Sequence, residues 1–222
     1  MQGKSCDELL RRGAAQLGLP LDESLVRQFE RYRRLLATWG EKINLTALRD
    51  PQQVVIRHFL DSLALVRRLP AAAALPVPTL VDVGSGAGLP GAVCALLRPD
   101  LRVTLVERVN KKAAFLLTLR RELGLHYEVR PEDAARLPTR FGAVISRAAL
   151  PLPQWLPFAT QLAAPGGVVV AMTSAAEPLP APPDALQLQL DELYDVGAGP
   201  HRLLLYAVTG APAEVALPAP TS

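Results

Sequence analysis

The stretch LVDVGSGAGLPG, residues 80–91, decides the fold of this chain. Its opening residues continue an apolar run from Thr79, and glycines follow at once, which is typical of a buried parallel strand that ends in a tight loop. A helical pattern begins near Pro90. In open α/β sheets, a glycine-rich loop between a strand and a helix lies at the carboxyl end of the strand, where ligands bind. The stretch therefore predicts a doubly wound sheet together with the position of its ligand site.

Strand and helix patterns alternate beyond this loop. The predicted strands are 79–84, 101–108, 126–130, 143–148 and 166–172, and the predicted helices are 88–98, 110–123 and 152–162, the last interrupted by Pro157. This alternation is typical of α/β proteins with a mostly parallel sheet. Two further runs, 186–194 and 202–208, are separated by Asp, Gly and Pro residues and predict a C-terminal antiparallel pair.

Residues before the sheet predict helices. One apolar stripe recurs at steps of four and three and consists of Leu25, Phe29, Tyr32, Leu36 and Trp39. A second helix begins at Asp50, a favourable N-cap, with Gln53 placed to complete a capping box, and it ends before Pro70. We therefore expect three parts, which are a helical cap (1–70), an α/β domain (76–209) reached through an Ala/Pro-rich linker, and a frayed tail (210–222).

Composition limits the function classes. The 222 residues are half hydrophobic and 20% charged, with a mean hydropathy of +0.19, as in globular proteins. No run of about 20 apolar residues predicts a membrane helix, and the charged N-terminus is unlike a signal peptide, so we expect a cytoplasmic protein. Cys6 and Cys94 stand alone, so neither a disulfide framework nor a metal site is expected. No coiled-coil pattern is present, and we expect a monomer.

The charges are unevenly distributed along the chain. Residues 1–150 hold 23 Lys and Arg against 15 Asp and Glu, whereas residues 151–222 hold one against six. This excess of positive charge in the first two-thirds of the chain favours a polyanionic partner such as nucleic acid. A genome that uses Arg in place of Lys on solvated surfaces would explain the same excess.

An acidic residue before the glycines separates two ligand classes. Gly86–Gly91 matches the dinucleotide pattern G-x-G-x-x-G. Asp82, however, stands two positions before Gly84-Ser85-Gly86-Ala87-Gly88, the arrangement common in S-adenosylmethionine-dependent methyltransferases. A carboxylate suits the ammonium and sulfonium groups of that cofactor and would repel a pyrophosphate. The chain also lacks a Tyr-x-x-x-Lys pair, which argues against an NAD(P)-dependent oxidoreductase.

Two further acids fit a nucleoside ligand. Glu107 ends the second predicted strand, where a carboxylate accepts hydrogen bonds from ribose hydroxyls. Asp133 follows the third strand, where an acid often receives an adenine amino group. Either acid could instead have a purely structural role: Glu107 could lie beside a helix N-cap, and Asp133 could be a turn residue.

Four stretches in order within residues 20–175 carry a family resemblance. They are NLTALRDPQQVVIRHFLDSLAL (44–65), LVDVGSGAGLPG (80–91), VNKKAAFL (109–116) and VISRA (144–148). Together they resemble the RsmG (GidB) family of bacterial 16S ribosomal RNA guanine-N7 methyltransferases. The resemblance implies a Rossmann-like sheet, S-adenosylmethionine as cofactor, and methylation of guanine N7 at position 527, in the 530 loop of the small ribosomal subunit RNA.

The resemblance also implies site residues. The cofactor-binding positions are Gly84, Leu89, Glu107, Arg108, Val109, Ala134, Ala135 and Arg147, to which the acid and glycine patterns add Asp82, Gly86, Gly88 and Asp133. Lys111, Lys112, Arg147 and His58 are the candidate RNA-binding residues. The two lysines could equally form a solvated face, and His58 could simply pack its helix over the cleft.

Transfer to guanine N7 needs no base, because N7 has a free lone pair and carries no proton. We therefore expect catalysis by positioning, with Arg147 as a positioning residue, no protein nucleophile and no metal. The chain departs from the family after Gly167, where the usual Lys-Gly is replaced by Thr173-Ser174. An RNA-binding protein without methyltransferase activity is accordingly a second reading.

Overall fold

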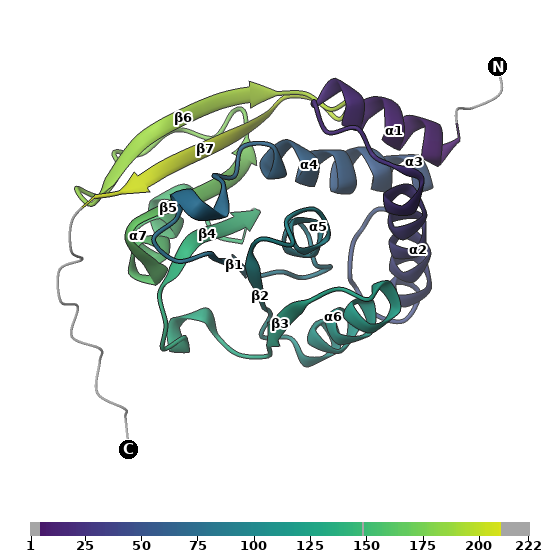
Figure 1. The fold of residues 1–222 in the computed structure, drawn as a ribbon, viewed down its shortest axis with the longest axis horizontal. Helices are drawn as coiled ribbons and strands as arrows, with labels where there is room; N and C mark the ends of the chain where they lie inside the picture. Colours follow the sequence, from purple (N-terminus) through teal and green to yellow (C-terminus); the bar gives the residue numbers. More distant parts are fainter. Residues whose placement is uncertain (1–4, 148, 210–222) are drawn as a thin grey trace.

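A computed structural model describes residues 5–147 and 149–209, and its centre is one seven-stranded sheet (Figure 1). The strands are β1 (Thr79–Val83), β2 (Arg102–Val106), β3 (Tyr127–Arg130), β4 (Phe141–Arg147), β5 (Ala163–Ser174), β6 (Leu186–Tyr194) and β7 (His201–Val208). Their order is β3-β2-β1-β4-β5-β7-β6. β1 to β5 are parallel, while β7 runs antiparallel to β5 and to β6. The predicted fold class is confirmed.

Alternate side chains of the strands pack on opposite faces of the sheet. Leu80 and Ile145 share one core cluster with Phe115 of α6 (Asn110–Leu123). Val81 shares the other cluster with Trp155 of α7 (Leu152–Leu162). α5 (Gly91–Leu97) also lies on the α6 face. This alternation is the expected consequence of the two-residue period of a strand.

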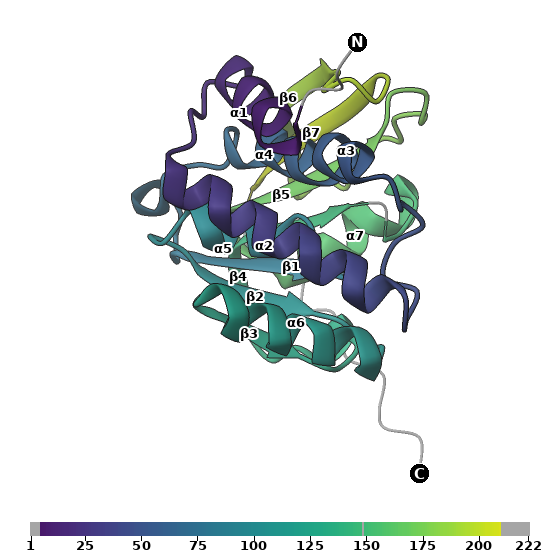
Figure 2. The same cartoon turned by 90° about the vertical axis from the view of Figure 1, so that its right-hand side faces the viewer.

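The N-terminal helices pack on the face that α5 and α6 cover. They are α1 (Cys6–Gln16), α2 (Glu23–Gly40), α3 (Pro51–Val54) and α4 (Asp61–Val66), and in Figure 2 α2 lies beside α6. Phe29, Tyr32 and Leu36 of the predicted stripe are buried in the core cluster that contains Leu80. The helical cap and the sheet therefore share one core. Their separation into two domains remains a prediction, and the expected tail at 210–222 lies outside the described residues.

The predicted second helix is not α-helical throughout, because a π-helical segment lies within it. Asp50 caps it, because its Oδ1 accepts from Gln53 N at 2.7 Å. Between α3 and α4, however, Val55–Leu60 form a π-helical segment. Such segments are rare and occur frequently at functional sites. Here the segment contains His58 and is followed directly by Asp61.

Two local expectations were wrong. Pro157 does not interrupt its helix, because α7 is continuous and buries Trp155, Leu156 and Ala159 around the proline. The strand predicted at 166–172 begins earlier, at Ala163, so Pro165, Gly166 and Gly167 lie inside β5, where the register with β4 shifts between Phe141 and Ala143. A bulge absorbs the extra residues without ending the strand.

None of the helices in the described part of the chain has the length and apolar character of a membrane span.

Candidate functional site

The glycine loop lies at the carboxyl ends of β1 and β2. The N–H groups of Gly84 and Ser85 both donate to Val106 O at 3.0 Å. From the opposite side, Tyr32 of α2 donates its hydroxyl to Ala87 O at 2.7 Å. Gly88 has φ +84°, and a Cβ there would lie 2.7 Å from the Tyr32 Oη. The glycine at this position is therefore required by the packing of α2 on the loop.

Asp82 is buried beneath this loop. Its side chain is 1% exposed, and Oδ2 accepts from Gly91 N, at the start of α5, at 3.0 Å. Burial raises the pKa of Asp82 to about 6, against the opposing effect of the Gly91 N–H. Its Oδ1 is buried without a hydrogen-bond partner among the described residues. The carboxylate thus joins β1 to α5 and keeps one acceptor unsatisfied.

Glu107 binds two backbone groups. Its Oε2 accepts from Gly86 N at 2.9 Å and its Oε1 accepts from Val109 N at 2.8 Å. The second bond satisfies an N–H at the start of α6. The structure thus places Glu107 both beside a helix N-cap and against the glycine loop.

A cavity of about 480 Å³, here called the glycine-loop cavity, opens where β1 and β2 end. The predicted residues that line it are Gly84, Glu107, Arg108, Val109, Asp133 and Ala134. Sequence reasoning missed Ala149, Leu150 and Phe158, which complete the wall. Asp133 accepts from Ala135 N at 3.0 Å and caps the 3₁₀ turn Ala134–Arg136. Leu89 is buried in the core, away from this cavity.

A second cavity of about 630 Å³, here called the Arg147 cavity, adjoins the end of β4. Arg147 Nη1 lies 3.2 Å from Asp61 Oδ2 and 3.0 Å from Arg57 O. Asp61 Oδ1 in turn accepts from the Tyr194 hydroxyl at 2.6 Å. The arginine, its carboxylate partner and the tyrosine come from β4, α4 and β6, and no short motif links them in the sequence.

His58 lies in the same cluster. Its Nε2 is 2.8 Å from Thr46 Oγ1 and its Nδ1 is 3.1 Å from Arg57 O. Burial, and then the charge of Arg147, lower the pKa of His58 to about 4. The ring is therefore neutral at pH 7 and is 9% exposed. RNA contact by His58 stays a prediction.

The two predicted lysines lie in a basic groove. Lys111 and Lys112, at the start of α6, line a hollow of about 370 Å³ together with Lys42 and Arg49. Lys112 also lines the glycine-loop cavity, so the two depressions adjoin there. Four cations from two distant segments outnumber Glu41, the single carboxylate among the described residues that line the hollow, and favour an anion.

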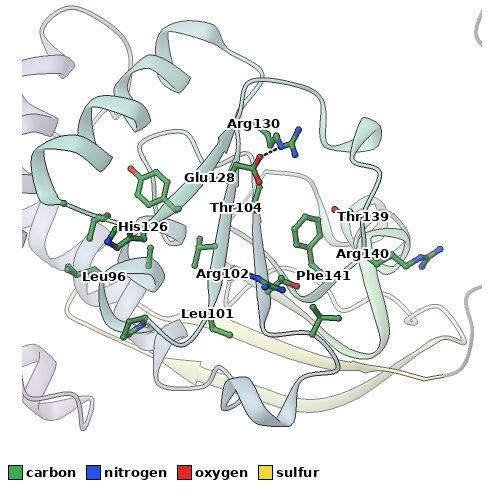
Figure 3. Close-up of a pocket in the computed structure, with 18 of the residues that line it drawn as sticks. Leu96, Leu101, Arg102, Thr104, His126, Glu128, Arg130, Thr139, Arg140 and Phe141 are labelled. Atoms are coloured by element: carbon green, nitrogen blue, oxygen red, sulfur yellow. Dashed lines mark ion pairs between the residues drawn. The ribbon is translucent and has the colours of Figure 1, made fainter.

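A larger cavity of about 820 Å³ lies away from these residues, along the amino ends of the strands (Figure 3). Thr79, Arg102 and Phe141, the first residues of β1, β2 and β4, line it, and Arg130 pairs there with Glu128 at 2.7 Å. Ligands of doubly wound sheets bind at the carboxyl ends, so volume alone does not make this cavity the site. Across the described residues, no group of three His, Cys, Asp or Glu side chains could hold a metal ion.

The strand order, the glycine loop and its two acids define a Rossmann-like methyltransferase. Solved structures agree on the fold. Magnesium protoporphyrin IX methyltransferase from Synechocystis PCC 6803, 13% identical, covers 94% of this chain and 100% of its own with a TM-score of 0.59. TrmN from Thermus thermophilus, 19% identical, covers 69% of this chain and 53% of its own with a TM-score of 0.53.

Sequence comparison narrows this class to one family. The model of rRNA small subunit methyltransferase G (GidB) matches residues 25–200. Ribosomal RNA small subunit methyltransferase G of Anaeromyxobacter sp. is 41% identical over 73% of this chain and 76% of its own length. The protein of that name from Burkholderia multivorans is 40% identical over 75% of each. The chain belongs to the rRNA small subunit methyltransferase G family, and this membership supports S-adenosylmethionine as its cofactor.

Proposed function

We propose that this chain transfers a methyl group from S-adenosylmethionine to N7 of a guanine in the 530 loop of 16S rRNA. One observation carries the proposal: Arg147, at the end of β4, lines one cavity, and Ala149, two residues further along the chain, lines the other. A cofactor in the glycine-loop cavity and a base in the Arg147 cavity would be neighbours, as group transfer requires.

The residues of the glycine-loop cavity fit the cofactor. Asp82 does not line the cavity itself but lies beneath the loop, where its buried Oδ1, without a partner among the described residues, could be satisfied by a bound water. Glu107 lies where a ribose would present its hydroxyls, and the Ala134 backbone lies where an adenine edge would be recognised. Phe158 and Leu150 supply the apolar wall that a purine ring needs.

When bound, the cofactor supplies an electrophilic methyl group on a positively charged sulfur. The N7 lone pair forms the new bond to carbon, and the electron pair of the broken carbon–sulfur bond stays on sulfur. No proton moves in this step, so the protein's task is to align N7, carbon and sulfur. A neutral, buried His58 agrees with this mechanism, because no general base is needed.

Arg147 favours guanine over adenine in this scheme. Guanine presents O6 as an acceptor beside N7, whereas adenine presents an amino donor. Asp61 and the Arg57 carbonyl orient the guanidinium, which can donate another N–H to O6 and leave N7 free. The basic groove, with Lys111 and Lys112, would bind the RNA backbone beside the base.

The test is methyl transfer from labelled S-adenosylmethionine to small subunits that lack this modification, with 23S RNA and large subunits as controls. Mapping by cleavage specific for N7-methylguanine identifies the base. We expect one signal, in the 530 loop, at a rate that falls steeply with added salt. Methylation of another base or atom would refute the guanine-N7 proposal.

The second reading, an RNA-binding protein without activity, predicts cofactor and RNA binding with no transfer in this assay. This reading is considered because Thr173 and Ser174, which line the Arg147 cavity, replace the lysine that is usual in the family.

We further propose that the chain acts as a monomer in the cytoplasm, where ribosomal subunits are available to it. Sedimentation at the assay concentration tests the monomer.

A further inference from the structure

The Arg147 cavity has an aromatic wall that the mechanism above does not use. Tyr194, the last residue of β6, and His201, the first of β7, are paired across the hairpin and both line the cavity. Their rings stack with centroids 5.8 Å apart and an interplanar angle of 28°. We propose that His201, backed by Tyr194, is the platform on which the target guanine stacks, and this inference rests on the proposed function.

Burial and a hydrogen bond fix the position of the Tyr194 side chain. It is 9% exposed, and its hydroxyl donates to Asp61, the carboxylate that also pairs with Arg147. Burial and the Asp61 charge raise the pKa of Tyr194 well above its ordinary value, so the hydroxyl keeps its proton and continues to donate. The ring and Arg147 are thus oriented by the same carboxylate.

His201 is fixed through its own ring nitrogen. Nδ1 lies 2.9 Å from Gly199 O, and a carbonyl can only accept, so this nitrogen carries a hydrogen. Tyr194 stacks against the imidazole, and His201 lines the Arg147 cavity, so a base bound there would stack on the side of the ring that Tyr194 leaves open. Unpaired RNA bases stack on such rings, histidine included. Stacking is tolerant of base identity, so guanine selection would remain with Arg147.

Ion pairs connect the hairpin that carries Tyr194 and His201 to the helical cap. Glu192 of β6 forms ion pairs with Arg67 and Arg68, directly after α4. Figure 1 shows β6 and β7 at the edge of the sheet, beside α4 and β5. The platform is therefore held at a set position relative to Arg147 at the end of β4.

The experiment separates the ring of His201 from its hydrogen bond. His201→Asn keeps an N–H donor for Gly199 O and removes the ring, whereas His201→Phe keeps a ring and removes the donor. His126→Asn, in the cavity at the amino ends of the strands, is the matched control. For each protein we would measure kcat/KM on small subunits and the Kd of S-adenosylmethionine.

We expect kcat/KM to fall by about tenfold or more in His201→Asn and to stay within about threefold of the parent in His201→Phe, because one stacked base contributes on this scale. His126→Asn should match the parent, and the cofactor Kd should not change in any variant. A loss in His201→Phe with full activity in His201→Asn would overturn the stacking role. So would full activity in both variants.

A second readout does not depend on turnover. An RNA hairpin with 8-vinylguanine, a fluorescent base that keeps O6 and N7, at the mapped target position should lose fluorescence on binding the parent and His201→Phe, because the base stacks on a ring. His201→Asn should leave the base bright, and equal quenching by all three proteins would overturn the proposal. If the parent methylates no RNA, the proposed function fails. If it methylates normally and both His201 variants do as well, only this inference fails.

Discussion

Gly88 and Tyr32 offer a direct test of how the helical cap supports the glycine loop. Gly88 has φ +84°, where alanine costs about 1–2 kcal/mol. A Cβ at this position would also lie 2.7 Å from the Tyr32 Oη, and such overpacking costs about 1–3 kcal/mol. Gly88→Ala alone should therefore reduce the free energy of unfolding by about 2–5 kcal/mol.

Tyr32→Phe removes both the obstruction and a hydrogen bond. Losing the bond from Oη to the buried Ala87 carbonyl should cost about 1–2 kcal/mol. In the double variant the added methyl no longer meets the hydroxyl, so part of the overpacking disappears, while Leu116 Cδ2 at 3.1 Å and Ala92 Cβ at 3.3 Å stay close to it. We expect the double variant to be about 1 kcal/mol more stable than the sum of the single changes predicts.

Urea unfolding of the four proteins, with linear extrapolation to water, gives these free energies. The Kd of S-adenosylmethionine should follow the same order, because the loop borders the glycine-loop cavity. Additivity within about 0.5 kcal/mol would refute the reasoning, since the hydroxyl would then not be what excludes a side chain at Gly88.

Three further predictions use the same site. Burial holds the pKa of Asp82 at about 6, above its ordinary value, so the folded state binds this proton more tightly than the unfolded chain and the resulting stability is lost as pH rises. The stability of the parent relative to Asp82→Asn should therefore fall by about 2 kcal/mol between pH 4 and 7 in urea titrations, and a rise would contradict the shift. Ala134→Phe should place a ring in the glycine-loop cavity and raise the cofactor Kd in calorimetry by about tenfold or more, with an unchanged Kd arguing for another binding site. Arg147→Ala leaves Asp61 buried without its cation and should cost about 2–3 kcal/mol in unfolding free energy, less than for a fully buried pair because the Arg147 side chain is 22% exposed. Adding Asp61→Asn should recover part of that loss, and no recovery would show that the pair is not coupled.

The sheet was predictable because its signals are local. The strands β1, β2 and β4 are apolar runs that end at or just before a glycine or a charged residue, and the loop at 84–90 follows the first of them directly. The apolar stripe of α2 and the Asp50 cap likewise depend only on spacing within a few residues. The π-helical segment was not predictable, because its residues fit an ordinary helix pattern and its cause lies in tertiary packing.

The sequence by itself determined the fold class, the position of the glycine loop, and about half of the wall of the glycine-loop cavity. Those residues follow strand ends, and the ends of neighbouring parallel strands meet at one edge of the sheet. Only the tertiary structure decided the Arg147 cavity. Asp61, Arg147, Tyr194 and His201 come from α4, β4 and the closing hairpin, and no periodicity or motif connects residues up to 140 positions apart. Their meeting depends on the order of the last strands, because placing β7 between β5 and β6 brings the loop end of the hairpin, with Tyr194 and His201, beside α4.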